Sequence, residues 1–282
     1  MSQGEAGEVT TTPLQKSAAP TRDRRSRVWA GLVEVALVLG LYVAYSLTRL
    51  VADDSMAPAL ERARDLLHFE RWLGLDLEAG LNQLFVDQSW LGLAGSFYYA
   101  TAHYLVTGIA LIWLWRRGPT AYLPARRALM LATAIALVLY VLLPMAPPRM
   151  IDGYVDVLQL SSAHGWWGGE ASAPRGLGGY TNQLAAFPSM HAGWALWVAW
   201  VVQREARSRV LRALAWTHAL VTSLVIVGTG NHWVLDAVVG WAAVVAAVVA
   251  LRPMRLPRPT RRAAPAPSGP PPDPSWSTSA AG

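Results

Sequence analysis

Apolar segments alternate with polar ones along most of the 282-residue chain. A helix that spans a membrane needs about 20 mainly apolar residues, and several segments approach that length. They cover residues 28–50, 90–115, 128–143, 184–202, 210–228 and 232–251. The pattern therefore predicts an all-α fold, a polytopic membrane helix bundle with about six transmembrane helices.

Basic residues give the orientation of these spans. Of the 24 Lys and Arg residues, 18 precede the first span, separate the second from the third or the fourth from the fifth, or follow the sixth. Six spans place all four of these segments on one face, and the positive-inside rule makes that face cytoplasmic. We therefore expect a multi-pass protein of the cell membrane with both termini in the cytoplasm.

The ends of the chain and one long loop differ from the spans. Residues 1–27 are rich in Ser, Thr, Pro and charge, and residues 252–282 are rich in Pro, so we expect two disordered cytoplasmic tails flanking a membrane domain over 28–251. The loop "RARDLLHFERWLGLDLEAGLNQLF", residues 62–85, has the pattern of an amphipathic helix on the extracytoplasmic membrane surface.

Composition supports a membrane protein. Apolar residues make up 53% of the chain and charged residues 15%, whereas soluble domains carry about 25% charge. The net charge of +6 comes from residues beside the spans, so topology explains it and we expect no nucleic-acid partner. The chain has no cysteine, which excludes disulfides and thiolate metal sites.

Three polar motifs from distant parts of the chain are predicted to meet at the extracytoplasmic mouth: "APPRM" (146–150), "FPSMH" (187–191) and "NHWVLD" (231–236). In the third motif, His232 and Asp236 would share one face of a helix. Asp236 could then fix the imidazole tautomer and leave the other nitrogen as a nucleophile. The alternative is a polar clamp between helices.

The other two motifs suit phosphate binding. Pro188 fits the first turn of a helix, which would leave the amides of Ser189 and its neighbours free for an anion, and His191 could protonate a leaving oxygen. Arg149 could pair bidentately with phosphate. The simpler interpretations are a plain helix cap with an interfacial histidine, and an arginine that contacts lipid headgroups.

The motifs "APPR", "PSMH" and "HWVLD", in this order, resemble the signature motifs of the type 2 phosphatidic acid phosphatase superfamily. "NQLAAFPSMHAGWA", "FYYATAHY" and "FERWLGLDLEAGLNQ" resemble its inositolphosphotransferase branch, which includes inositol phosphorylceramide synthase. The resemblance covers residues from about 60 to about 245. It implies that His232 attacks phosphorus, Asp236 orients it, His191 protonates the leaving group, and Arg149 with the Ser189 backbone holds the phosphoryl oxygens.

The same resemblance implies a membrane lipid or lipid-phosphate substrate, a polyol or lipid alcohol as a possible acceptor, and no metal or other cofactor. The sequence also departs from the superfamily. The usual lysine of the first motif is missing, and Ile226 occupies the position of the usual arginine of the third. Asn231, Thr229 and His103 are the candidates to take their place.

A non-catalytic transporter or assembly protein on the same scaffold is the rival hypothesis. Transport predicts polar residues at mid-membrane, and the span centres here carry almost no charge apart from Glu34 near the start of the first. The pattern therefore favours the enzyme.

The predicted orientation can be tested with fused reporters. A reporter after Leu251 should behave as cytoplasmic, and one inserted between Gly165 and Gly179 should behave as extracytoplasmic. The reason is that segments rich in Lys and Arg stay on the cytoplasmic face. The assay is alkaline phosphatase against fluorescent-protein activity in cells. The reverse pattern would contradict the orientation and the site's location.

Overall fold

The computed structural model describes residues 55–168, 175 and 182–252, together with scattered positions between Trp29 and Leu47, which are helical. Within these ranges the regular elements are helices, and an isolated bridge joins Met145 to Ala185. The fold class predicted from the sequence, an all-α membrane helix bundle, is therefore confirmed. The two predicted tails, and most of the first predicted span, lie outside the described residues.

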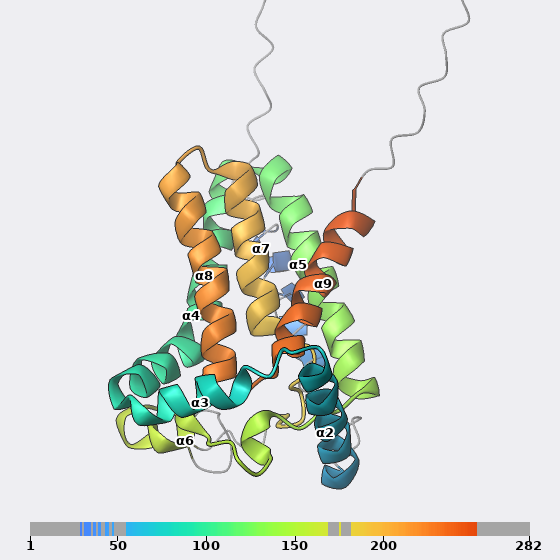
Figure 1. Ribbon diagram of the computed structural model, residues 1–282. Coiled ribbons are helices and arrows are strands. Elements are labelled where there is room, and N and C mark those ends of the chain that lie inside the picture. Colours follow the sequence, from blue (N-terminus) through green and yellow to red (C-terminus); the bar gives the residue numbers. More distant parts are fainter. Residues whose placement is uncertain are drawn as a thin grey trace, which may run out of the picture. The chain divides into compact units, whose positions relative to one another are not determined.

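Five helices form the bundle: α4 (Ser89–Arg117), α5 (Pro119–Leu142), α7 (Met190–Glu205), α8 (Arg209–Gly228) and α9 (Val234–Ala250). Helix α7 contacts the other four (Figure 1). Three of the described helices, α4, α5 and α8, are long and apolar enough to cross a membrane, while α9 is apolar but shorter. With α7 also short, at 16 residues, the total of six spans stays a prediction.

Small residues allow α7 to pack closely against its neighbours. Ala195 and Ala199 of α7 are fully buried against Ala215 and Ala219 of α8. Gly240 brings α9 against the start of α7, since a Cβ atom there would lie 2.1 Å from the Ser189 carbonyl oxygen. The close approach of these two helices fixes the relative position of two of the predicted motifs.

The outer faces of the bundle are apolar. On α4, Leu105, Ile109 and Ile112 repeat at helical spacing, and each exposes more than half of its surface. Such a stripe would be a liability in water but is the expected lipid-facing surface of a spanning helix.

The predicted surface segment forms two helices, α2 (Met56–Trp72) and α3 (Glu78–Asp87). Together with the short helix α6 (Val157–Leu160), they lie at one end of the bundle (Figure 1). Helix α2 buries Ala59 and Ala63, while its exposed Phe69 and Trp72 rings stack on one another 5.8 Å apart. This arrangement has the amphipathic character that the sequence predicted.

Two predicted helix starts are wrong. Helix α5 begins at Pro119 rather than at residue 128, because a proline suits the first helical turn. Arg126 therefore lies inside the helix, where it pairs with Glu34 of the first apolar segment, and Tyr122 donates to the same carboxylate. Pairing removes the penalty of placing this charge within the apolar segment.

Helix α7 begins at Met190 rather than at residue 184. The residues before it run beside another loop, since the Met145 amide donates to the Leu184 carbonyl at 2.8 Å. The Pro188 carbonyl accepts a hydrogen bond from the Tyr140 hydroxyl at 2.9 Å. Pro188 was predicted in the first helical turn. It instead precedes the N-cap, Ser189.

Candidate active site

Backbone hydrogen bonds join the three predicted motifs to one another. The Arg149 amide donates to the Gly230 carbonyl at 2.9 Å, and the Ser189 amide donates to the Asp236 carbonyl at 2.8 Å. Gly230 has a φ of 76°, a left-handed conformation that favours glycine. The structure therefore brings "APPRM", "FPSMH" and "NHWVLD" together, as predicted.

His232 is buried, and its Nδ1 atom has two acceptors. The carbonyl oxygen of Ala186 lies 2.9 Å away and Asp236 Oδ2 lies 3.3 Å away. The Ala186 carbonyl can only accept, so Nδ1 carries the hydrogen and Nε2 keeps a free lone pair. The geometry has the orienter and the oriented base that nucleophilic catalysis requires.

The structural basis of this contact differs from the predicted one. His232 is not on a helix with Asp236, because α9 begins only at Val234, with Trp233 as its N-cap. Asp236 lies in the first turn and reaches back, accepting from the Trp233 amide at 2.8 Å as well as from His232. The carboxylate thus caps the helix and holds the imidazole at once.

His191, in the first turn of α7, faces His232 with 5.5 Å between ring centroids. Tyr99 of α4 stacks on His191 at 4.3 Å, and the ring of His103 lies 3.9 Å from His191. His103 Nδ1 is 3.1 Å from the Tyr99 carbonyl, so it too carries a hydrogen and directs Nε2 away from its own backbone. The accessory candidate His103 thus lies beside the histidine pair.

Ser189 serves the site differently from the prediction. Its amide donates to Asp236, and its hydroxyl accepts from the Ala192 amide at 3.4 Å. The Ser189 amide is therefore not free for an anion. The amides of Met190 and His191 follow it in the first turn of α7, where no intrahelical acceptor reaches them.

Arg149 is held in place by two side chains. Its Nη1 donates to Asn231 Oδ1 at 2.7 Å, and its Nε lies 3.2 Å from Asp156 Oδ2. The side chain is 9% exposed; burial lowers the pKa of Arg149, and the Asp156 charge opposes this shift. An arginine remains protonated even so, which leaves a fixed positive charge next to the chain segment that carries His232.

The family model described as PAP2 superfamily matches residues 64–250. The chain belongs to the PAP2 superfamily. No curated protein and no solved structure matches it. This membership indicates an enzyme of the phosphatase or phosphotransferase type in a membrane. The narrower resemblance to the inositolphosphotransferase branch remains a prediction.

In this PAP2 protein, Asn231 is one of the two residues that orient Arg149, and Thr229 supports Asn231. The Thr229 hydroxyl donates to the Val225 carbonyl at 2.8 Å and lies 3.1 Å from Asn231 Nδ2. Ile226, at the position of the usual arginine, is buried in α8. Among the described residues of the three motifs, Arg149 is therefore the one that carries a fixed positive charge.

Sequence reasoning missed Asp156 and the precise role of Tyr99. Asp156 is the N-cap of α6 and accepts a hydrogen bond from the Gln159 amide, which is an ordinary role for an aspartate. Tyr99 lies within the quoted "FYYATAHY" segment, but its position over His191 depends on how α4 packs against α7. Neither contact leaves a signal in residue spacing.

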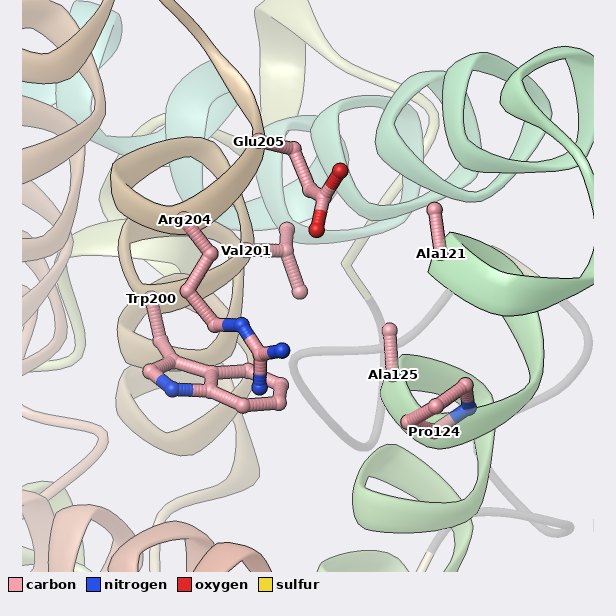
Figure 2. Close-up of a pocket in the computed structure, with 7 residues that line it drawn as sticks. All are labelled: Ala121, Pro124, Ala125, Trp200, Val201, Arg204 and Glu205. Atoms are coloured by element: carbon pink, nitrogen blue, oxygen red, sulfur yellow. The ribbon is translucent and has the colours of Figure 1, made fainter.

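Two other features of the described residues do not contribute to the site. Arg175 donates to the carbonyl oxygens of Trp167 and Ser162. A small cavity between α5 and α7 is lined by Arg204 and Glu205 among others (Figure 2). These two residues end α7, whereas His191 lies in its first turn. No group of three or more metal-binding side chains occurs among the described residues.

The substitution Arg149→Lys tests whether the planar guanidinium of Arg149 binds phosphate. A lysine keeps the charge but cannot bond Asn231 and Asp156 and still present a planar donor pair to phosphate. Losing a hydrogen bond to a charged group costs about 1.5–3 kcal/mol, so orthovanadate should bind about 10- to 100-fold more weakly. Arg175→Lys is the matched control, and equal affinity in the wild type and Arg149→Lys would contradict the assignment.

Proposed function

We propose that the protein is an integral membrane phosphotransferase or phosphatase that acts on a lipid phosphate or phospholipid through a phosphohistidine on His232. The oriented imidazole of His232, facing His191 across 5.5 Å, is the observation that carries this proposal. The fixed guanidinium of Arg149 supports it, because a phosphoryl group needs a cation in a place that water does not screen.

The first step forms a bond between His232 Nε2 and phosphorus and breaks the bond from phosphorus to the leaving oxygen. His191 gives its proton to that oxygen. Arg149 and the first-turn amides of α7 stabilise the charge on the remaining phosphoryl oxygens. Asp236 stabilises the positive charge that develops on the His232 ring.

The second step reverses these roles. An acceptor hydroxyl, or water, loses its proton to His191 and bonds to phosphorus, while the bond from phosphorus to Nε2 breaks. His232 and the protonated His191 are thereby restored. The site lies at the end of the bundle that carries α2, α3 and α6, and we place this end at the extracytoplasmic face because the basic segments flank the other helix ends.

The rival hypothesis is a transporter or assembly protein. Transport predicts polar residues at mid-membrane, but the Glu34–Arg126 pair lies near the start of α5, towards the proposed cytoplasmic end. The rival hypothesis leaves the oriented His232, His191 and Arg149 without a role. The enzyme is therefore the better explanation.

Substitutions of the histidines test the mechanism. His232→Ala should abolish turnover of lipid phosphates, and His191→Ala should slow it by about 100- to 10,000-fold, as expected for a lost general acid. Asp236→Asn should keep the fold yet lose most activity, because the amide misorients the imidazole. The measurement is phosphate or headgroup release by purified protein in detergent, with the exposed His68→Ala as control. Full activity in His232→Ala would exclude this mechanism.

Transfer to a hydroxyl is the outcome we favour over hydrolysis, on the resemblance to the inositolphosphotransferase branch. The loop from residue 151 to residue 186 is rich in glycine and carries Trp166 and Trp167, a composition that suggests a flexible aromatic cover over the site. In the described part of this loop, however, Trp167 is buried. Its Nε1 donates to the Leu158 carbonyl at 2.9 Å, and its ring centroid lies 4.8 Å from that of Phe97. That tryptophan is a packing residue, so it does not support a closing cover.

The acceptor can be identified directly. A labelled phospholipid donor is supplied with inositol, glycerol or a lipid alcohol, and the products are separated. We expect a new phosphodiester whose formation requires His232. Release of free phosphate or headgroup alone, with every acceptor, would make the protein a hydrolase.

A further inference from the structure

Two glutamates of the surface helices reach beneath the start of α9. Glu70 lies near the end of α2 and Glu78 begins α3, and both are completely buried. Glu78 Oε1 accepts from the Val234 amide at 3.0 Å, and Glu70 Oε1 accepts from the Leu235 amide at 2.7 Å. These contacts link a surface segment to the helix that follows His232.

Three consecutive amides at this helix start are therefore bonded to three different carboxyl groups. Asp236 takes the amide of Trp233, Glu78 takes that of Val234, and Glu70 takes that of Leu235. One side chain ordinarily suffices as a helix cap, and burying two further carboxylates is costly unless each is fully bonded. A cap alone does not explain the pair.

The second oxygens of the pair have no partner as they stand. Glu70 Oε2 and Glu78 Oε2 are buried, and neither receives a hydrogen bond from a described residue. Burial raises the pKa of Glu70 to about 9; the Leu235 hydrogen bond opposes this shift, while the charge of Glu78, side-chain hydrogen bonding with Glu78 and the charge of Asp236 add to it. Glu70 is therefore protonated at neutral pH, and its hydrogen needs an acceptor.

We propose that Glu70 and Glu78 share one proton and act as positioning residues for the nucleophile, by fixing the first turn of α9. This inference rests on the proposed function of His232. A shared proton satisfies both second oxygens and removes the repulsion between two adjacent carboxylates. The pair then holds the backbone to which Asp236 belongs.

The position of this turn sets the contact that matters for the imidazole. His232 is fixed on its other side, because its amide donates to the Ile226 carbonyl at 3.1 Å. Its Nδ1 lies 3.3 Å from Asp236 Oδ2, near the long limit of a hydrogen bond. A small displacement of the α9 start would therefore break the contact between Asp236 and His232.

Kinetics of matched variants test the proposal. Glu70→Gln keeps an oxygen for the Leu235 amide and an N–H for Glu78, so kcat should stay within about 3-fold of the wild type, since hydrogen bonds are conserved. Glu70→Ala and Glu78→Ala should each lower kcat by about 10- to 100-fold through misplacement of the imidazole. KM should change little, because Arg149 is untouched. Glu61→Ala, on the exposed face of α2, is the control.

The pH profile separates a shared proton from a plain structural cap. The titratable groups around Glu70 are Glu78 from α3, Asp236 from α9 and Tyr154 from the loop, whose pKa burial raises to about 12. As the pH rises through about 9, Glu70 loses its proton and the two carboxylates repel, so wild-type activity should fall. Glu70→Gln cannot ionise and should retain activity there. An identical alkaline limb in both proteins would overturn the proposal.

Hydrogen–deuterium exchange tests the same contacts without turnover. In full-length protein in lipid nanodiscs, the amides of Val234 and Leu235 should exchange faster in Glu78→Ala and Glu70→Ala, but remain protected in Glu70→Gln and Glu61→Ala. If the wild type showed no phosphoryl transfer, the proposed function would fail while this measurement still stood. If the Val234 and Leu235 amides stayed protected in both alanine variants, and both kept the wild-type kcat, the positioning role would be overturned.

Discussion

Asp236 makes the hydrogen bonds on which the rest of the site depends. Its side chain accepts from the Trp233 amide and lies 3.3 Å from His232 Nδ1, while its backbone carbonyl accepts from the Ser189 amide. One residue therefore caps α9, orients the imidazole and holds the start of α7. Because His191 lies two residues after Ser189, the same contacts set the spacing of the two histidines.

The surrounding fold makes these contacts possible. Gly240 allows α7 and α9 to approach closely, and Tyr140 of α5 donates to the carbonyl before the N-cap of α7. In an apolar bundle, each of these polar groups must find a partner within the protein. The site is thus built where helix ends leave unpaired backbone groups, and we propose that the amides that remain recognise phosphate.

Much of the bundle could be predicted from the sequence, because long apolar runs identify α4 and α8 to within a residue or two. The convergence of Arg149, His191 and His232 was also predictable, since the number of spans decides which loops share a face. The helix start at Met190 was not, because the residues before it bond partners far away in the chain, Met145 and Tyr140. Nor was the place of Arg126 inside α5, because it depends on the distant Glu34.

Carboxyl groups that bond to the site were the main failure of sequence reasoning. Asp156, Glu70 and Glu78 look like ordinary solvated residues of polar segments, yet each bonds a group of the site. Periodicity places apolar residues inside, but it gives no signal for a carboxyl group that is buried to satisfy a distant helix end. Such residues become visible only when the helices are packed.

Direct trapping of the phosphorylated enzyme tests the central claim. The protein is incubated with a phosphate-labelled lipid, quenched in alkali, digested and examined by mass spectrometry. The account predicts a base-stable, acid-labile phosphoryl group on the peptide that contains His232, absent from His232→Ala. Turnover with no such peptide, or with the label on another residue, would contradict it.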